Sequence, residues 1–122
     1  MVNSDFNIKD GIIYNLIAYS YDALGEHETA LTYIDSSITL NKKRGNYKDE
    51  ASGYRQAAYI YLNELDDVNK AATYMEISYY LDPNSIDLED DKTLGWVDDI
   101  YIVKIQQDDI DGVFSFTNFL KK

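Results

Sequence analysis

A pattern of aromatic and small residues recurs along this chain about every forty residues. Two clear copies carry residues of the same kind at nearly the same spacing: Tyr14, Ala18, Tyr21 and Ala30, then Tyr54, Ala58, Tyr61 and Ala71. A weaker third copy begins at Trp96. A fixed period of this length is the signature of stacked helical repeats. Such proteins usually present extended binding surfaces, so the pattern favours a binding protein over an enzyme.

Apolar residues recur at intervals of three and four residues, the spacing of a helix face, in six segments. We predict helices over residues 9–24, 29–42, 49–65, 68–81, 93–106 and 110–120. Glycine, proline or paired aspartates stand between most of these segments and favour turns or helix caps. The expected fold is therefore all-α: one domain, an α-solenoid of three antiparallel helix pairs, without strands.

Charge and composition narrow the classes of partner. The 122 residues carry 22 acidic and 11 basic side chains, a net charge of −11. This charge argues against binding to nucleic acid or to an anionic membrane surface. It would attract a basic partner, although it also serves solubility. The absence of cysteine excludes disulfides, thiolate zinc sites and cysteine nucleophiles.

Targeting signals and membrane spans are not visible in the sequence. Residues 1–10 are polar and lack the pattern of a signal peptide. No apolar run approaches the length of a membrane span. We therefore expect a cytoplasmic protein, or a soluble piece of a longer one.

The repeated positions resemble the tetratricopeptide repeat family. In the first repeat the fitting residues are Tyr14, Ile17, Ala18, Tyr21, Gly25, Ala30, Ser37 and Leu40. In the second they are Tyr54, Ala57, Ala58, Tyr61, Ala71, Ser78, Leu81 and Pro83. The resemblance implies a right-handed solenoid with repeats at about 11–44, 49–83 and 92–121, the third degenerate and serving as a cap. The period exceeds the family's roughly 34 residues and is similar to that of variant repeats in bacterial peptide-sensing regulators and some scaffold proteins.

The same resemblance implies that the first helix of each repeat lines a concave groove that binds a peptide. The residues at its groove positions are Asn15, Tyr19, Asp22, Arg55, Gln56, Tyr59, Asn63, Asp98, Tyr101 and Ile105. Tyr19, Tyr59 and Tyr101 occupy equivalent positions. They either form a ladder that contacts the peptide or pack between neighbouring helices. The lysine and asparagine clamp by which some family members bind a terminal carboxylate is not reproduced.

No catalytic or metal-binding motif is present. The single histidine, His27, lies between Glu26 and Glu28 in a predicted turn, and we interpret it as a solvated turn residue. The acidic stretch 82–91 lacks the central glycine of a helix–loop–helix calcium site and has Ile86 at a ligand position. We interpret it as a linker that caps the next helix, and we expect no cofactor and no enzymatic activity.

Two functions fit these observations. The first is a scaffold or adaptor module that holds a peptide or protein partner in the concave groove. The alternative is the peptide-sensing domain of a bacterial signalling or transcriptional regulator whose output domain lies outside this chain. The C-terminal residues Phe114, Phe116 and Phe119 are expected to be exposed, which suggests either a homo-oligomer formed through the last helices or further repeats beyond Lys122.

Overall fold

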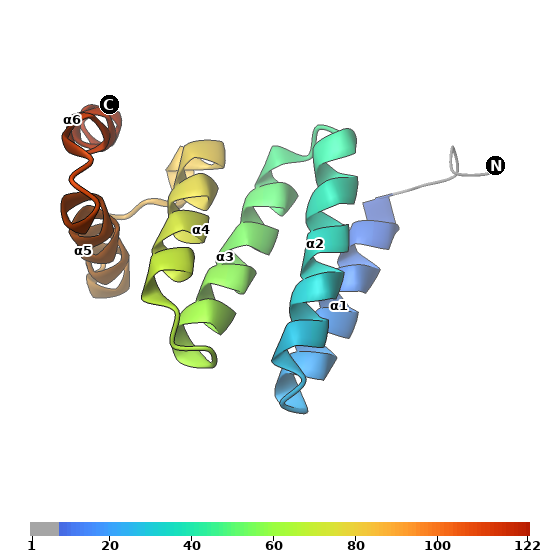
Figure 1. Cartoon of the computed structure of the whole chain (residues 1–122). Helices are drawn as coiled ribbons and strands as arrows, with labels where there is room; N and C mark the ends of the chain where they lie inside the picture. Colours follow the sequence, from blue (N-terminus) through green and yellow to red (C-terminus); the bar gives the residue numbers. More distant parts are fainter. Residues whose placement is uncertain (1–7) are drawn as a thin grey trace.

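The computed structural model describes residues 8–122, with side chains from Asp10 onward, and contains six α-helices (Figure 1). They are α1 (Ile8–Ala23), α2 (His27–Lys43), α3 (Tyr47–Asn63), α4 (Val68–Leu81), α5 (Asp91–Gln106) and α6 (Ile110–Leu120), with a short 3-10 turn, η2 (Pro83–Ser85), after α4. The described range contains no strand. The predicted all-α fold with six helices is confirmed, and each helix end lies within two residues of its predicted position.

The helices stack in consecutive pairs. Helix α1 packs against α2 and α3 against α4, while α2 also packs against α3 and so joins the first two pairs. Helix α5 packs against both α4 and α6. In Figure 1 the first four helices run upright, whereas α5 and α6 are seen close to end-on. The third pair of the solenoid is therefore turned relative to the other two.

Each helix pair turns at a residue in the left-handed backbone region. Gly25 follows α1 with φ 82°, Asp66 follows α3 with φ 52°, and Asp108 follows α5 with φ 55°. Only glycine adopts this region without a steric penalty from its side chain. In the second and third turns the next aspartate, Asp67 or Asp109, caps the following helix by accepting a hydrogen bond from a backbone N–H. The predicted turns and caps are confirmed at these positions.

Small residues allow the paired helices to approach closely. Ala18, Ala30, Ala58 and Ala71 are all fully buried. A close approach also joins the first pair to the second, because a Cβ atom added at Gly53 of α3 would lie 2.7 Å from Cγ1 of Ile38 of α2. These contacts leave no room for larger side chains.

Tyrosine rings fill the space beside the small residues. In the first pair Tyr21 stacks on Tyr33 with ring centroids 5.5 Å apart. In the second pair Tyr54 and Tyr61 meet Tyr74 of α4 edge-on, with ring centroids 5.8 and 5.1 Å apart. These are favourable aromatic geometries. The tyrosines predicted to pack the solenoid do so, and each of the first two pairs contributes one further tyrosine from its second helix.

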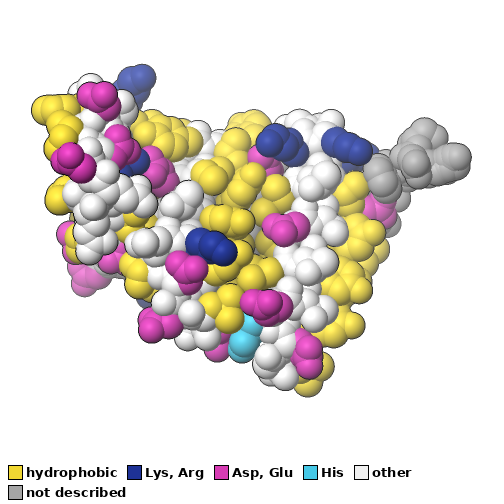
Figure 2. Space-filling model, viewed as in Figure 1, with side chains coloured by type: hydrophobic (Ala, Val, Ile, Leu, Met, Phe, Trp, Pro, Cys, Tyr) yellow, Lys and Arg dark blue, Asp and Glu magenta, His cyan; other side chains and the backbone are white. Residues whose placement is uncertain are grey.

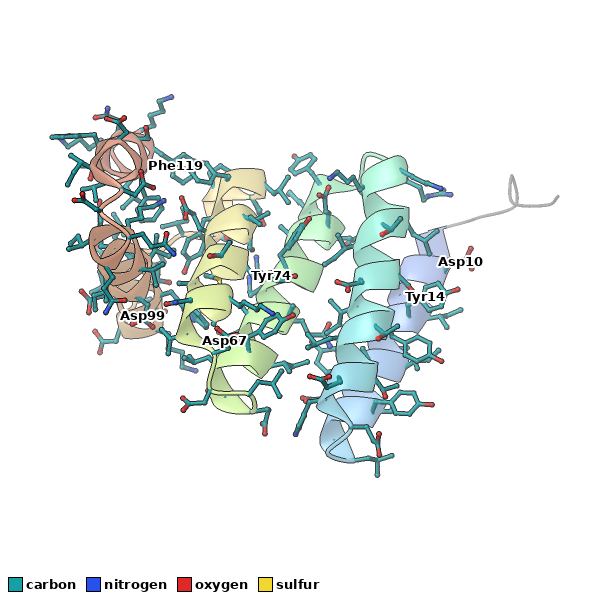
Figure 3. All side chains as sticks on the ribbon, viewed as in Figure 1. Asp10, Tyr14, Asp67, Tyr74, Asp99 and Phe119 are labelled. Atoms are coloured by element: carbon teal, nitrogen blue, oxygen red, sulfur yellow. The ribbon has the colours of Figure 1, made fainter. Side chains whose placement is uncertain are left out.

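The third pair is built around a phenylalanine instead of a close alanine contact. Phe116 of α6 is fully buried, and Phe119 is partly buried against Tyr80 of α4, with ring centroids 4.3 Å apart (Figure 3). The expectation that all three phenylalanines are exposed is wrong, because α6 turns two of them inward. Phe114 alone stays largely exposed, together with Ile110 at the start of the same helix.

The surface carries acidic, basic and apolar side chains in distinct places. Figure 2 shows the face formed by α2 and α4, where hydrophobic side chains gather between the two helices.

Among residues 8–122, no helix combines the length and the apolar character that a membrane span needs. The same residues contain no group of acidic or histidine side chains placed to hold a metal ion.

Candidate functional site

A hollow of about 230 Å³ lies between the first helices of the first two pairs, α1 and α3. Its lining consists of Tyr19, Asp22, Gln56, Tyr59, Ile60, Asn63 and Glu64. Five of these are residues that the resemblance placed in the groove: Tyr19, Asp22, Gln56, Tyr59 and Asn63. They meet because spacings of three and four residues put them on one face of each helix. We call this feature the α1–α3 hollow.

A second hollow of about 190 Å³ continues the same surface between α3 and α5. Its lining consists of Tyr59, Leu62, Lys92, Gly95, Trp96 and Asp99. Tyr59 borders both hollows, and its ring meets the Trp96 ring edge-on at 5.5 Å. Gly95 helps to keep the space open, because a Cβ atom there would meet nothing within 4 Å. We call it the α3–α5 hollow.

The three tyrosines of the predicted ladder do not share one role. Tyr19 is 58% exposed and Tyr59 is 42% exposed, and both border the hollows. Tyr101 instead lies between α5 and α6, where its ring meets Phe116 at 5.2 Å and its hydroxyl lies 2.6 Å from the Thr117 hydroxyl. The ladder therefore has two exposed members, and the third belongs to the packing of the last helix pair.

Two amide atoms at the groove positions are buried without a hydrogen-bond partner in the described part of the chain. They are Oδ1 of Asn15 on α1 and Nε2 of Gln56 on α3. A buried polar atom without a partner costs about 1–3 kcal/mol. Of these two residues only Gln56 lines the α1–α3 hollow, so only its amide lies beside a space that a ligand could enter.

Arg55 is the remaining predicted groove residue of α3. It is partly buried on α3 and does not line either hollow. Its charge acts on Tyr79 of α4: burial raises the pKa of the Tyr79 phenol to about 12, although a hydrogen bond with Thr93 and the charge of Arg55 act to lower it. Arg55 is therefore close enough to Tyr79 of α4 for its charge to act on the phenol.

His27 is not the solvated turn residue that the sequence suggested. It is the first residue of α2 and is only 22% exposed. Its Nδ1 atom lies 2.6 Å from Oδ1 of Asp22 on α1, and its Nε2 atom lies 3.4 Å from Oε2 of Glu64 at the end of α3. Glu64 was not among the predicted site residues. The histidine thus joins the first two pairs and positions both acids at one end of the α1–α3 hollow.

Acidic side chains border both hollows, and in the second a lysine accompanies the acid. Asp22 and Glu64 border the first, while Asp99 and Lys92 border the second. Burial raises the pKa of the Asp99 carboxyl, and the adjacent charge of Asp98 raises it further. Exposed aromatic rings beside carboxylates form a suitable environment for a cationic side chain.

No known protein family, curated protein or solved structure matches this chain. Its class therefore follows from its own fold and surface. It is an all-α protein of three stacked helix pairs with two adjoining hollows along the first helices of those pairs.

Proposed function

We propose that this chain is a tetratricopeptide-like module that binds an extended, basic peptide segment of a partner protein along α1, α3 and α5. The observation that carries the proposal is the continuity of the two hollows, which share Tyr59. Each hollow is large enough for about one side chain, so a peptide crossing both would place successive side chains in them.

The side chains around the α1–α3 hollow would make different kinds of contact with the peptide. The exposed rings of Tyr19 and Tyr59 supply apolar contact area at a small cost in side-chain entropy. Asp22 and Glu64 attract a lysine or arginine side chain of the peptide. The side chain of Gln56 also lines this hollow, and we expect its amide to turn toward a peptide carbonyl and donate to it on binding.

The partner is a protein or a free peptide, and the two cases correspond to different roles. An adaptor in the cytoplasm would hold a segment of a larger protein. A bacterial peptide sensor would bind a short free peptide and pass the signal to an output domain. The small size of the hollows suits both ligands. The two roles are distinguished by comparing the affinity for a free short peptide with the affinity for the same segment inside a protein.

The test uses two tyrosines of similar exposure. Tyr19 borders the α1–α3 hollow and is 58% exposed, whereas Tyr47 lies outside both hollows and is 53% exposed. Peptides are selected from a random library with the intact chain, and their affinities are measured by calorimetry. We expect selected peptides to be rich in lysine and arginine. Tyr19→Ala should weaken them about tenfold, equivalent to about 1.4 kcal/mol, and Tyr47→Ala should leave them unchanged.

Circular dichroism should show the same helical content in both variants. Equal affinity of the selected peptides for both variants would remove the α1–α3 hollow from the proposal. Selection of acidic peptides would contradict the assigned role of its carboxylates.

A further inference from the structure

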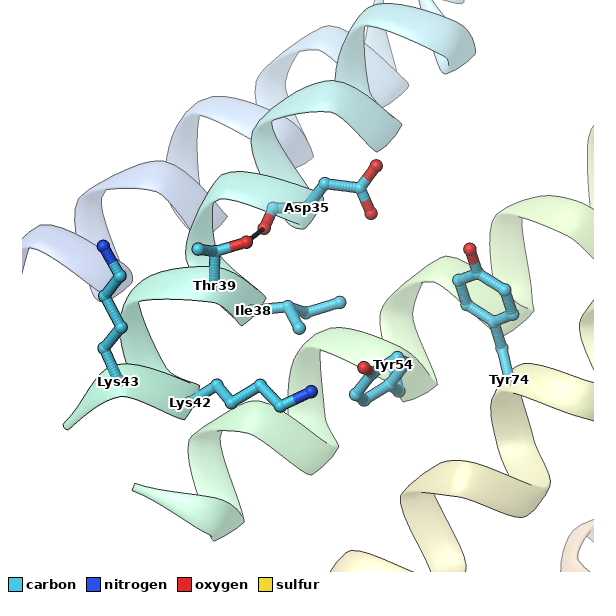
Figure 4. A pocket seen from close by; sticks show the side chains of 7 residues that line it. All are labelled: Asp35, Ile38, Thr39, Lys42, Lys43, Tyr54 and Tyr74. Atoms are coloured by element: carbon cyan, nitrogen blue, oxygen red, sulfur yellow. Dashed lines mark hydrogen bonds between the residues drawn. The ribbon is translucent and has the colours of Figure 1, made fainter. Parts of the chain in front are cut away.

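A larger hollow lies on another face of the solenoid, between α2 and α4 and above α3 (Figure 4). It has a volume of about 450 Å³ and is lined by Asp35, Ile38, Thr39, Lys42, Lys43, Tyr54 and Tyr74. Volumes of this size are typical of ligand-binding pockets. We call it the α2–α4 furrow. Tyr54 and Tyr59 are five residues apart on α3, about 140° around the helix, so the furrow and the two hollows face different directions.

The floor of the furrow is apolar and held in place by packing. Ile38 is 7% exposed, and the rings of Tyr54 and Tyr74 meet edge-on at 5.8 Å. Tyr61 supports Tyr74 from the other side at 5.1 Å. Because these contacts belong to the core of the first two pairs, the floor is formed before any ligand binds. Figure 2 shows hydrophobic side chains gathered in this part of the surface.

The wall contributed by α2 has opposite charges at its two ends. Asp35 and Lys42 are seven residues apart, or two helical turns, which corresponds to about 10 Å along the helix. In Figure 4 Lys42 extends toward Tyr54, whereas Lys43 extends away from it. Neither Asp35 nor Lys42 forms an ion pair with another described residue. Partial burial raises the pKa of the Asp35 carboxyl, although the residue remains exposed and accessible to a partner.

A helix is the partner element whose spacing matches this wall. On a helix, residues at i, i+3, i+4 and i+7 share one face. The furrow presents Asp35, then Ile38 and Thr39, then Lys42 in this same spacing. A second helix lying alongside α2 would place its own residues i and i+7 opposite the two charges, and its residues i+3 and i+4 over the aromatic floor. This is the helix-in-groove mode of recognition.

We propose that the α2–α4 furrow binds an amphipathic helix of a partner protein that carries a basic and an acidic residue seven positions apart with apolar residues between them. The basic residue pairs with Asp35, the acidic residue pairs with Lys42, and the apolar side chains cover Tyr54 and Tyr74. This binding is independent of the peptide proposed for the α1–α3 hollow, so the protein would hold two partners at once.

The experiment uses a capped helical peptide with Lys, Leu, Phe and Glu at positions i, i+3, i+4 and i+7, and alanine and glutamine elsewhere. Two comparison peptides carry Glu at both charged positions or Lys at both. Binding to the intact chain is measured by calorimetry, and the methyl signal of Ile38 is followed by NMR. We expect the mixed-charge peptide to bind at least tenfold more tightly than either comparison peptide and to shift the Ile38 signal.

Reversing the charge of Lys42 then tests whether the acidic residue of the peptide pairs with this end of the furrow. Lys42→Glu should weaken the mixed-charge peptide at least tenfold and make the peptide with two lysines the preferred ligand. Lys121→Glu changes the net charge equally at an exposed C-terminal position outside the furrow, and should leave the preference unchanged. Tyr19→Ala should also have no effect, since that residue belongs to the α1–α3 hollow.

Three results would overturn the proposal. They are the absence of binding by the mixed-charge peptide, an unchanged preference in Lys42→Glu, and an Ile38 signal that does not move on binding. Loss of binding in Tyr19→Ala would place the peptide in the α1–α3 hollow instead of the furrow. Since Lys42 does not line that hollow, failure here leaves the peptide-library test of the proposed function unaffected.

Discussion

Gly53 and Gly95 provide a direct test of the close helix contact between the first two pairs. Both glycines lie inside helices, Gly53 in α3 and Gly95 in α5. Gly53 is buried, and a Cβ atom there would lie 2.7 Å from Cγ1 of Ile38. Gly95 is exposed, and a Cβ atom there would meet no atom within 4 Å. Substitution by alanine therefore adds the same methyl group in two different surroundings.

The magnitude follows from two opposing effects. Alanine is favoured over glycine inside a helix by about 1 kcal/mol, and this gain applies to both sites. At Gly53 the added methyl group overpacks the contact with Ile38, which typically costs about 1–3 kcal/mol. We expect Gly95→Ala to raise the free energy of unfolding by up to about 1 kcal/mol. The free energy of unfolding of Gly53→Ala should be lower than that of Gly95→Ala by about 1–3 kcal/mol.

The assay is urea unfolding followed by circular dichroism, with both variants compared with the unmodified chain. Ile38→Ala removes the atom that the new methyl group would meet. In that background Gly53→Ala should become stabilising, because the two changes are coupled through one contact. Equal stabilisation by both glycine substitutions in the unmodified chain would refute the reasoning, and so would a Gly53 effect that does not depend on Ile38.

Two further predictions concern the second turn and the buried tyrosines. Asp66→Gly should stabilise the chain by roughly 0.5–1 kcal/mol in thermal melts, since it places at this left-handed residue (φ 52°) the glycine that Gly25 already provides in the first turn. Asp67→Ala, one residue later, should lower the stability by about 1 kcal/mol by removing the helix cap. A change in stability of the same sign for both substitutions would contradict the turn geometry. Burial raises the pKa of the Tyr61 and Tyr79 phenols to about 12, so their stabilising effect is complete below pH 10 and is lost as the pH rises from 10 toward 12, where the unfolded chain ionises first. Burial also raises the pKa of the Tyr54 and Tyr80 phenols, so absorbance titration should show a group of late-ionising tyrosines in the folded chain, Tyr61 and Tyr79 last. Uniform ionisation near pH 10 would count against this packing.

The positions of the helices could be predicted from the sequence because each depends on short-range information. Apolar spacing marked every helix, and glycine and aspartate marked the turns within two residues. The packing tyrosines were identified because the repeat places them at equivalent positions. What the repeat could not show was which second-helix residues they contact, since Tyr33 and Tyr74 are not part of the aromatic pattern of the first helices.

The errors arose where a side chain has its partner in another helix pair or in a pair that departs from the repeat. His27 is separated by many residues from Glu64, so the sequence alone indicated a solvated turn. Tyr101 shares its repeat position with Tyr19 and Tyr59 but faces α6, because Phe116 replaces the close alanine contact of the earlier pairs. Equivalence of position therefore failed where the geometry of the repeat changes.

Helix α3 determines the shape of both candidate binding surfaces. It packs against α2 and α4, and it contributes Tyr54 to the α2–α4 furrow and Tyr59 to the two hollows. Each ring is held by a partner from a neighbouring helix, Tyr74 in the first case and Trp96 in the second. Because the two rings have separate partners and face different directions, a substitution that alters one surface should leave the other intact. The independence of the two proposed partners is therefore a consequence of how α3 is packed.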